Sequence, residues 1–125
     1  MMLRWLPVVL WMFVILGLSS IPSLGSSRQL LPGIDKLVHM GEYSVLGFFF
    51  ARAAHFQGVA WKVVLPTAFF GLLVGSADEL YQATVPGRMS DALDTAADVI
   101  GASVGATAWF WRRRRTAPLD DQRSS

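Results

Sequence analysis

Four long apolar segments follow one another along the 125-residue chain, and short polar or turn-forming stretches separate them. They cover residues 5–21, 35–56, 61–81 and 91–111. A helix needs roughly 20 mainly apolar residues to cross a hydrocarbon core about 30 Å thick, so each segment has a suitable length. The pattern predicts an all-α polytopic membrane protein, a bundle of four transmembrane helices forming one domain over residues 1–115. We expect residues 116–125, which are short and polar, to form a disordered cytoplasmic tail.

The first segment has an alternative interpretation. Arg4, the apolar stretch after it and the Ser/Gly-rich exit at residues 23–27 also describe a signal peptide. The apolar part is longer than the hydrophobic region of a usual signal peptide, and the later segments would still carry the chain into a membrane. We therefore interpret residues 5–21 as a membrane anchor.

The composition narrows the class of protein and the chemistry that is available. Hydrophobic residues make up 53% of the chain and charged residues 16%, which argues against a disordered chain and against an ordinary water-soluble globule. The chain contains no cysteine, which excludes disulfides, thiolate nucleophiles and cysteine-ligated zinc or iron–sulfur sites. Any chemistry must therefore use carboxylates, histidine, arginine and hydroxyl groups.

The Lys and Arg residues predict the orientation, because short cytoplasmic loops carry an excess of them. If both termini lie in the cytoplasm, the outer side holds only Arg28, Lys36 and Arg88. The inner side then holds Arg4, Arg52, Lys62, Arg112, Arg113, Arg114, Arg115 and Arg123. We predict both termini to be cytoplasmic in the cell membrane, with the four-arginine run contacting anionic lipids. No other basic stripe accompanies this run, so we expect no nucleic-acid partner.

The remaining polar groups fall at three helix ends that should meet on the outer side. If the four helices alternate in direction, the start of the second, the end of the third and the start of the fourth lie at the same membrane face. A charged side chain near the bilayer centre costs about 2.5–3.5 kcal/mol, so carboxylates on these ends should face one another across a wet pocket. Small residues on the same faces should let the helices approach closely beneath it. These small residues are Gly71, Gly75, Gly101 and Gly105.

Helical spacing selects the residues that we expect to line this pocket. Side chains three or four positions apart share one helix face, which groups polar residues within each segment. The resulting set is Asp35, Lys36, His39, Glu42, Tyr43, Asp78, Glu79, Gln82, Arg88, Asp94 and Asp98. Its excess of carboxylates should attract a metal or a cationic ligand, or be neutralised by arginine and protonated histidine. The Pro86–Gly87 pair predicts a turn that brings Arg88 over the mouth of the pocket, where its guanidinium suits a phosphate or carboxylate.

Individual residues also have purely structural interpretations. Asp35 and Asp91 lie where helix N-terminal acids interact favourably with the helix dipole. Tyr43 has the alternative role of an aromatic residue at the membrane interface. His39 is one turn from Asp35 and close to Glu42, which makes it a functional candidate rather than only a buried histidine.

The same polar residues, in this order and spacing, resemble the VanZ-like family of small bacterial membrane proteins. The resemblance covers residues 33–109, and the first segment matches only as an apolar anchor. Its motif residues are Asp35, Lys36, His39, Tyr43, Leu46, Gly47, Asp78, Glu79, Gln82, Pro86, Gly87, Arg88, Ser90, Asp94, Asp98, Gly101 and Gly105. One residue departs from the pattern, because the family most often has Asn where this chain has Asp98. The founding member is associated with resistance to the glycopeptide teicoplanin, so the resemblance implies a bacterial envelope protein with a possible tie to resistance.

Three functions are compatible with these residues. The first is a non-enzymatic envelope protein whose pocket binds an anionic headgroup or cell-wall precursor through Lys36 and Arg88. The second is a membrane-embedded metal-dependent hydrolase or transferase, for which the catalytic candidates are His39, Glu79 and Asp94 and the metal-ligand candidates are Glu42, Asp78, Asp94 and Asp98. The third is a proton-coupled carrier, which four helices would form only as a homo-oligomer. The sequence identifies no cofactor and leaves open whether the protein is an enzyme.

Overall fold

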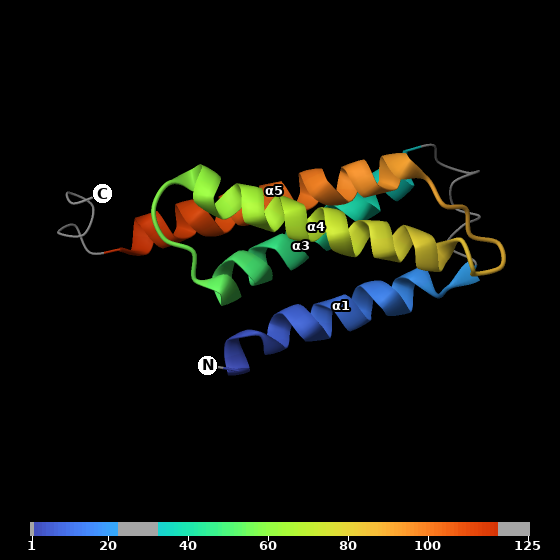
Figure 1. Ribbon diagram of the computed structural model, residues 1–125, viewed down its shortest axis with the longest axis horizontal. Coiled ribbons are helices and arrows are strands. Elements are labelled where there is room, and N and C mark those ends of the chain that lie inside the picture. The colour runs from blue at the N-terminus through green and yellow to red at the C-terminus, as the bar shows by residue number, and fades with distance from the viewer. Residues whose placement is uncertain (1, 23–32, 118–125) are drawn as a thin grey trace.

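The computed structural model describes residues 2–22 and 33–117. The described residues form one short 3-10 helix and four α-helices and contain no strand: η1 (Met2–Arg4), α1 (Leu6–Ser19), α3 (Ile34–Ala54), α4 (Ala60–Gln82) and α5 (Ala92–Thr116). Successive helices run in opposite directions along the long axis of the molecule (Figure 1). The all-helical prediction and the predicted alternation are therefore confirmed. Residues 118–125 of the predicted tail, together with Arg28, lie outside the described residues.

The fourth predicted helix is longer than the sequence indicated. It was expected to end at residue 111, but α5 continues to Thr116 and includes the whole arginine run. Arginine is a good helix former, and cations near a helix C-terminus interact favourably with its dipole. The guanidinium groups also lie over aromatic rings, at 5.6 Å for Arg113 on Trp109 and 5.0 Å for Arg114 on Phe110. Hydropathy alone ended the helix too early because charged residues lower the apolar character of a segment without ending its helix, and Thr116, predicted to begin the tail, is also helical.

The pair α3 and α5 is the most closely packed in the bundle. Gly101 and Gly105 of α5 lie against the backbone of α3, at Met40 and Ser44, where an added Cβ atom would clash with main-chain atoms. Gly71 of α4 similarly faces Ala102 of α5. Close approach at small residues is a common way for helices to pack in membranes, and it confirms the packing role predicted for these glycines.

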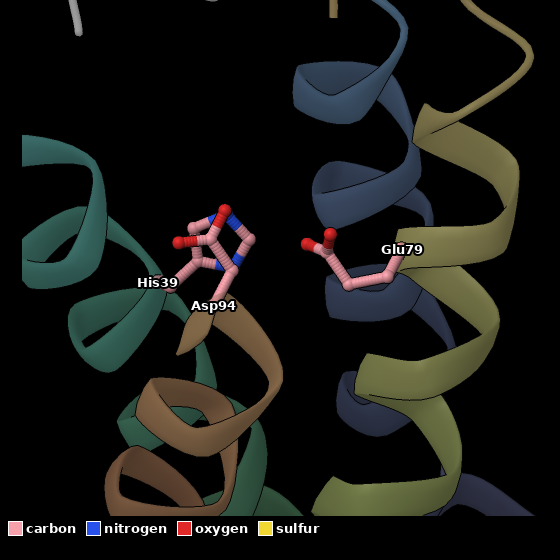
Figure 2. A group of neighbouring side chains, drawn as sticks. All are labelled: His39, Glu79 and Asp94. Atoms are coloured by element: carbon pink, nitrogen blue, oxygen red, sulfur yellow. The ribbon is translucent and has the colours of Figure 1, made fainter. Parts of the chain in front are cut away.

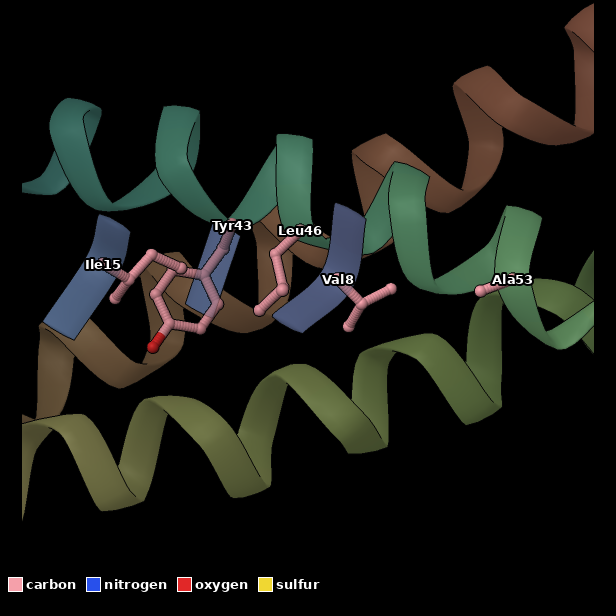
Figure 3. Packing of buried hydrophobic residues seen from close by; sticks show 5 residues of the cluster. All are labelled: Val8, Ile15, Tyr43, Leu46 and Ala53. Atoms are coloured by element: carbon pink, nitrogen blue, oxygen red, sulfur yellow. The ribbon is translucent and has the colours of Figure 1, made fainter. Parts of the chain in front are cut away.

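The apolar core divides into two clusters along the bundle. One joins α1 to α3 and contains Val8, Ile15, Tyr43, Leu46 and Ala53 (Figure 3). The other joins α3, α4 and α5 and contains Ala51, Val63, Ala106, Trp109 and Phe110. Between and around them the interior also holds buried polar side chains, which are Ser19, His39, Thr67, Asp78, Glu79, Gln82, Asp94 and Asp98.

The outside of the bundle is strongly apolar. Large side chains such as Phe13, Phe69 and Ile100 are each more than half exposed. Soluble monomers rarely expose continuous apolar patches of this kind. Two helical segments, Met2–Ser19 and Ala60–Gln82, are long and apolar enough to cross a membrane. Together these features give the chain membrane-protein character, while α3 and α5 are less apolar and do not meet the same criterion.

Candidate functional site

The polar ends of α3, α4 and α5 meet at one end of the bundle, as the alternation of the helices predicts. The residues that meet there come from the first turns of α3 and α5 and from the last turns of α4. A tight turn after α4 is closed by the Arg88 amide donating to the Val85 carbonyl at 3.1 Å, and Gly87 adopts a positive φ of 81° within it. The turn predicted at Pro86–Gly87 is thus confirmed. We call this group the polar centre, and its side chains are those of Asp35, Lys36, His39, Glu79, Asp91, Asp94 and Asp98.

Asp91 caps the helix that enters the polar centre from this turn. Its backbone is extended, and its carboxylate accepts a hydrogen bond at 2.9 Å from the Leu93 amide, which otherwise has no partner in the first turn of α5. The structural interpretation of Asp91 as a helix N-terminal acid is confirmed. Asp91 also contributes its carboxylate to an ion pair across the helices, so capping is only part of its role.

Lys36 of α3 is held by three carboxylates. Its Nζ atom lies 2.9 Å from Asp35, 2.8 Å from Asp91 and 2.6 Å from Asp94, and the Asp94 side chain is fully buried. An ammonium group has only three donors, and these three contacts account for all of them. Lys36 therefore neutralises neighbouring acids and joins α3 to α5, instead of standing open for an anionic ligand as the sequence suggested.

His39 lies one turn deeper and is also held by α5. Its Nδ1 atom is 2.8 Å from Asp98 Oδ1, and its Nε2 atom is 3.7 Å from Asp94 Oδ2. Because a carboxylate can only accept, Nδ1 donates its proton to Asp98, and Nε2 faces Asp94. The His39 side chain is almost completely buried and its ring stacks on Tyr43 at a centroid distance of 6.5 Å.

Glu79 completes this group from α4. Its Oε2 atom accepts a hydrogen bond at 2.7 Å from the Asp91 amide, while its Oε1 atom is buried without a hydrogen-bond partner. Figure 2 shows the Glu79 carboxylate directed toward His39 and Asp94. One ligand-type atom from each of the three side chains lies within 4.8 Å of the other two. All three catalytic candidates from the sequence are therefore brought together.

The metal-ligand candidates are only partly brought together. Of the four, Asp94 belongs to the cluster with His39 and Glu79. Asp78 instead accepts a hydrogen bond at 2.9 Å from Gln82, which also bonds Ser19 of α1 at 3.2 Å, so these residues tie α4 to α1. Asp98 supports His39 by accepting its Nδ1 proton.

Two further predicted pocket residues have environments that the sequence did not indicate. Tyr43 is fully buried in the core between α1 and α3, so its interpretation as an interfacial aromatic is wrong. Its hydroxyl group has no hydrogen-bond partner. Glu42 is half-buried, and its backbone carbonyl accepts a hydrogen bond at 2.8 Å from Trp11 of α1.

Two kinds of residue that position the site were missed. Gly75 was predicted only to let helices approach, but its α-carbon faces the Asp98 side chain, and an added Cβ would lie 2.5 Å from Asp98 Oδ2. Its position one turn before Asp78–Glu79 was the available signal. Ser19 and Trp11 of the first helix also bond into the polar end, at Gln82 and Glu42. Polar side chains facing inward from an otherwise apolar helix could have identified them.

Comparison with known proteins supports the resemblance found in the motifs. No curated protein and no solved structure matches the chain. The sequence model of the VanZ/LLP1 family matches residues 4–113, which is nearly the whole chain and includes every residue of the polar centre. The chain belongs to the VanZ/LLP1 family.

Proposed function

We propose that this VanZ/LLP1 protein is a multi-pass membrane protein of four transmembrane helices in one domain. In this proposal its polar centre lies near the outer membrane surface and binds an anionic ligand of the cell envelope, such as a lipid headgroup. Both termini are then cytoplasmic, and the arginines at the end of α5 contact anionic lipids.

Four spans are supported by the distribution of polar and apolar side chains. The exterior is apolar on α5 as well as on α1 and α4, for example at Ile100 and Val104, which are each 52% exposed. The interior, in contrast, contains buried carboxylates, including Asp94 and Asp98. Lipid is the solvent that favours apolar exteriors, and the enclosed carboxylates avoid the cost of facing hydrocarbon. The contacts of α5 with both α3 and α4 support a bundle in which these helices cross the bilayer together.

The anionic ligand is inferred from one observation, which is a buried donor without an acceptor. The Arg88 side chain is half-buried, and its Nε atom has no hydrogen-bond partner. Leaving a buried donor unsatisfied costs about 1–3 kcal/mol, and more for a charged group, so a ligand that supplies an acceptor would recover this energy. Phosphate and carboxylate groups match the planar donors of a guanidinium.

Topology is tested by cysteine accessibility, which is straightforward because the chain contains no cysteine of its own. Thr84→Cys and Gln57→Cys place single thiols on exposed loops at opposite ends of the bundle. In intact cells, a membrane-impermeant maleimide should label Thr84→Cys and leave Gln57→Cys unlabelled until the membrane is opened. Labelling of both or only of the second variant in intact cells would contradict the proposed orientation.

Ligand binding is tested with phosphatidate in mixed detergent micelles, using native mass spectrometry of the full chain. Loss of a charge-assisted hydrogen bond of about 1.5–3 kcal/mol predicts that Arg88→Ala weakens phosphatidate binding by roughly tenfold or more. Arg88→Lys should lose part of this affinity because it keeps the charge without the planar donors. Arg52→Ala removes an exposed arginine from the opposite end and serves as the matched control. Equal affinities for Arg88→Ala and Arg52→Ala would refute the proposed role of Arg88.

A further inference from the structure

We infer that the polar centre contains a divalent-cation site formed by His39 of α3, Glu79 of α4 and Asp94 of α5. One ligand-type atom from each residue lies within 4.8 Å of the others, and all three side chains are buried. Protein nitrogen and oxygen ligands lie about 2.0–2.2 Å from Zn²⁺ or Mg²⁺. Two atoms separated by 3.7 Å, the distance between His39 Nε2 and Asp94 Oδ2, can therefore contact the same ion.

The strongest support is the unsatisfied carboxylate oxygen of Glu79. This residue is only 5% exposed, and its Oε1 atom has no hydrogen-bond partner. The carboxylate is directed at His39 and Asp94 (Figure 2). Burying an ionised carboxylate is costly unless it is paired or coordinates a metal. A cation between these three side chains would satisfy the oxygen that the protein itself leaves unpaired.

Neighbouring residues hold each ligand in the required position. Asp98 accepts the Nδ1 proton of His39, so Nε2, which faces Asp94, is the ring nitrogen left to bind a metal. Carboxylates that fix a histidine in this way are a usual outer shell of metal sites. Lys36 binds Asp94 Oδ1, so Oδ2 is the oxygen on the histidine side. The Asp91 amide binds Glu79 Oε2 in the same manner.

A second group of acids nearby is a poorer candidate. Asp35, Asp91 and Asp94 also approach within 4.8 Å of one another. The Lys36 ammonium already lies between 2.6 and 2.9 Å from each of these carboxylates, so a cation is present there as part of the protein. The inferred metal therefore belongs on the other side of Asp94, toward His39.

One imidazole and two carboxylates define the class of metal. Imidazole suits Zn²⁺ and Fe²⁺, and carboxylates extend the range to Mn²⁺, whereas the absence of cysteine argues against soft ions. The ion would add positive charge to an end of the bundle that is rich in carboxylates. Its part in binding an anionic ligand rests on the proposed function, because the metal could accept a phosphate oxygen beside Arg88. The cation site itself does not depend on that ligand.

The site is tested with Mn²⁺ and the full chain purified in dodecyl maltoside, without anionic lipid. The wild type should bind one Mn²⁺ in this centre, with nitrogen coupling from one histidine in pulsed electron paramagnetic resonance. Glu79→Gln should weaken binding by at least about tenfold, since even outer-shell changes at metal sites cost 10–100-fold. His39→Gln should abolish the nitrogen coupling.

Asp78→Asn is the matched control. Asp78 is adjacent to Glu79 and similarly buried, and its change to an amide retains an oxygen that can accept from Gln82. We expect its Mn²⁺ affinity to stay within about twofold of the wild type. An equal loss in Asp78→Asn and Glu79→Gln would overturn the inference, because it would indicate general attraction by acids. Wild-type protein without saturable Mn²⁺ binding or without nitrogen coupling would also overturn it, whether or not the variants fold.

The same samples separate this inference from the proposed function. Phosphatidate binding is measured before and after removal of divalent ions with EDTA. Saturable, nitrogen-coupled Mn²⁺ binding without any phosphatidate binding would support the metal site and refute the anionic ligand. Phosphatidate binding that is sensitive to Arg88→Ala, in a protein that binds no Mn²⁺, would support the proposed function and refute the metal site.

Discussion

Replacing Gly75 by alanine should disrupt the support of His39 without touching any charged residue. An added Cβ at this position of α4 would lie 2.5 Å from Asp98 Oδ2 and 3.0 Å from Asp98 Cβ. The Asp98 side chain is fully buried and its Oδ1 atom is bound to His39 Nδ1. Either the carboxylate must move, which strains or breaks its bond to His39, or α4 and α5 must separate.

Two destabilising effects and one stabilising effect give the expected change in the free energy of unfolding. Inserting a methyl group into a packed interior costs about 1–3 kcal/mol. Losing a charge-assisted hydrogen bond costs about 1.5–3 kcal/mol. Alanine is favoured over glycine within a helix by about 1 kcal/mol, which offsets part of the loss. We expect Gly75→Ala to lower the free energy of unfolding by about 1.5–5 kcal/mol.

Gly41→Ala isolates the helix-propensity effect. Gly41 lies within α3, and an added Cβ there would meet no atom within 4 Å. This variant should be as stable as the wild type or more stable, by up to about 1 kcal/mol. Unfolding is followed by the helical circular dichroism signal during titration with sodium dodecyl sulfate. Equal stability of Gly75→Ala and Gly41→Ala would refute the reasoning from the clash with Asp98.

The effect on His39 is measured separately by nuclear magnetic resonance. The chain contains only two histidines, so protein labelled with ¹⁵N-histidine gives two imidazole spin systems to assign. The Nδ1 proton of His39 should be protected from exchange in the wild type and in Gly41→Ala, and it should exchange faster in Gly75→Ala. An unchanged His39 signal in a destabilised Gly75→Ala would show that the helices separate while the bond to Asp98 survives.

Three other measurements test the charged residues. Lys36→Met should lower the free energy of unfolding by about 2 kcal/mol, which is less than for a fully buried ion pair because Lys36 is partly exposed. The control Lys62→Met, at an exposed site, should change this free energy by less than about 0.5 kcal/mol. Similar losses in the two variants would contradict the ion-pair argument. Asp98→Asn should retain the hydrogen bond from His39 through its amide oxygen and be more stable than Asp98→Ala, and the reverse order would contradict this role. In the sodium dodecyl sulfate titration, Mn²⁺ at about 100 times its Kd should stabilise the wild type by about 2.7 kcal/mol. The same Mn²⁺ concentration should have little effect on the stability of Glu79→Gln. A failure of Mn²⁺ to stabilise the wild type would count against the metal site.

The pattern of apolar and polar residues along the chain was sufficient to predict the helices and the end of the bundle at which the polar groups gather. Apolar stretches of suitable length predicted four helices, because each must remove a similar apolar surface from water. Short connections made neighbouring helices antiparallel, and this brought the first turn of α3 together with the first turn of α5. The contacts of Lys36 with Asp91 and Asp94 are the outcome of that alternation. The end of α5 was less predictable, since stacking of Arg113 on Trp109 extends it.

The roles of individual acids depended on tertiary structure, because the rotation of each helix about its axis cannot be obtained from spacing alone. Adjacent residues on an α-helix point about 100° apart, as 3.6 residues make one turn. Asp78 and Glu79 were therefore equivalent in the sequence, and only packing turns Glu79 toward His39 and leaves Asp78 bonded to Gln82 near α1. That rotation is fixed where small residues let backbones meet, as at Gly75 against Asp98. The sequence by itself determined which helices form and which ends are polar, whereas close packing between the helices determined which polar atoms meet.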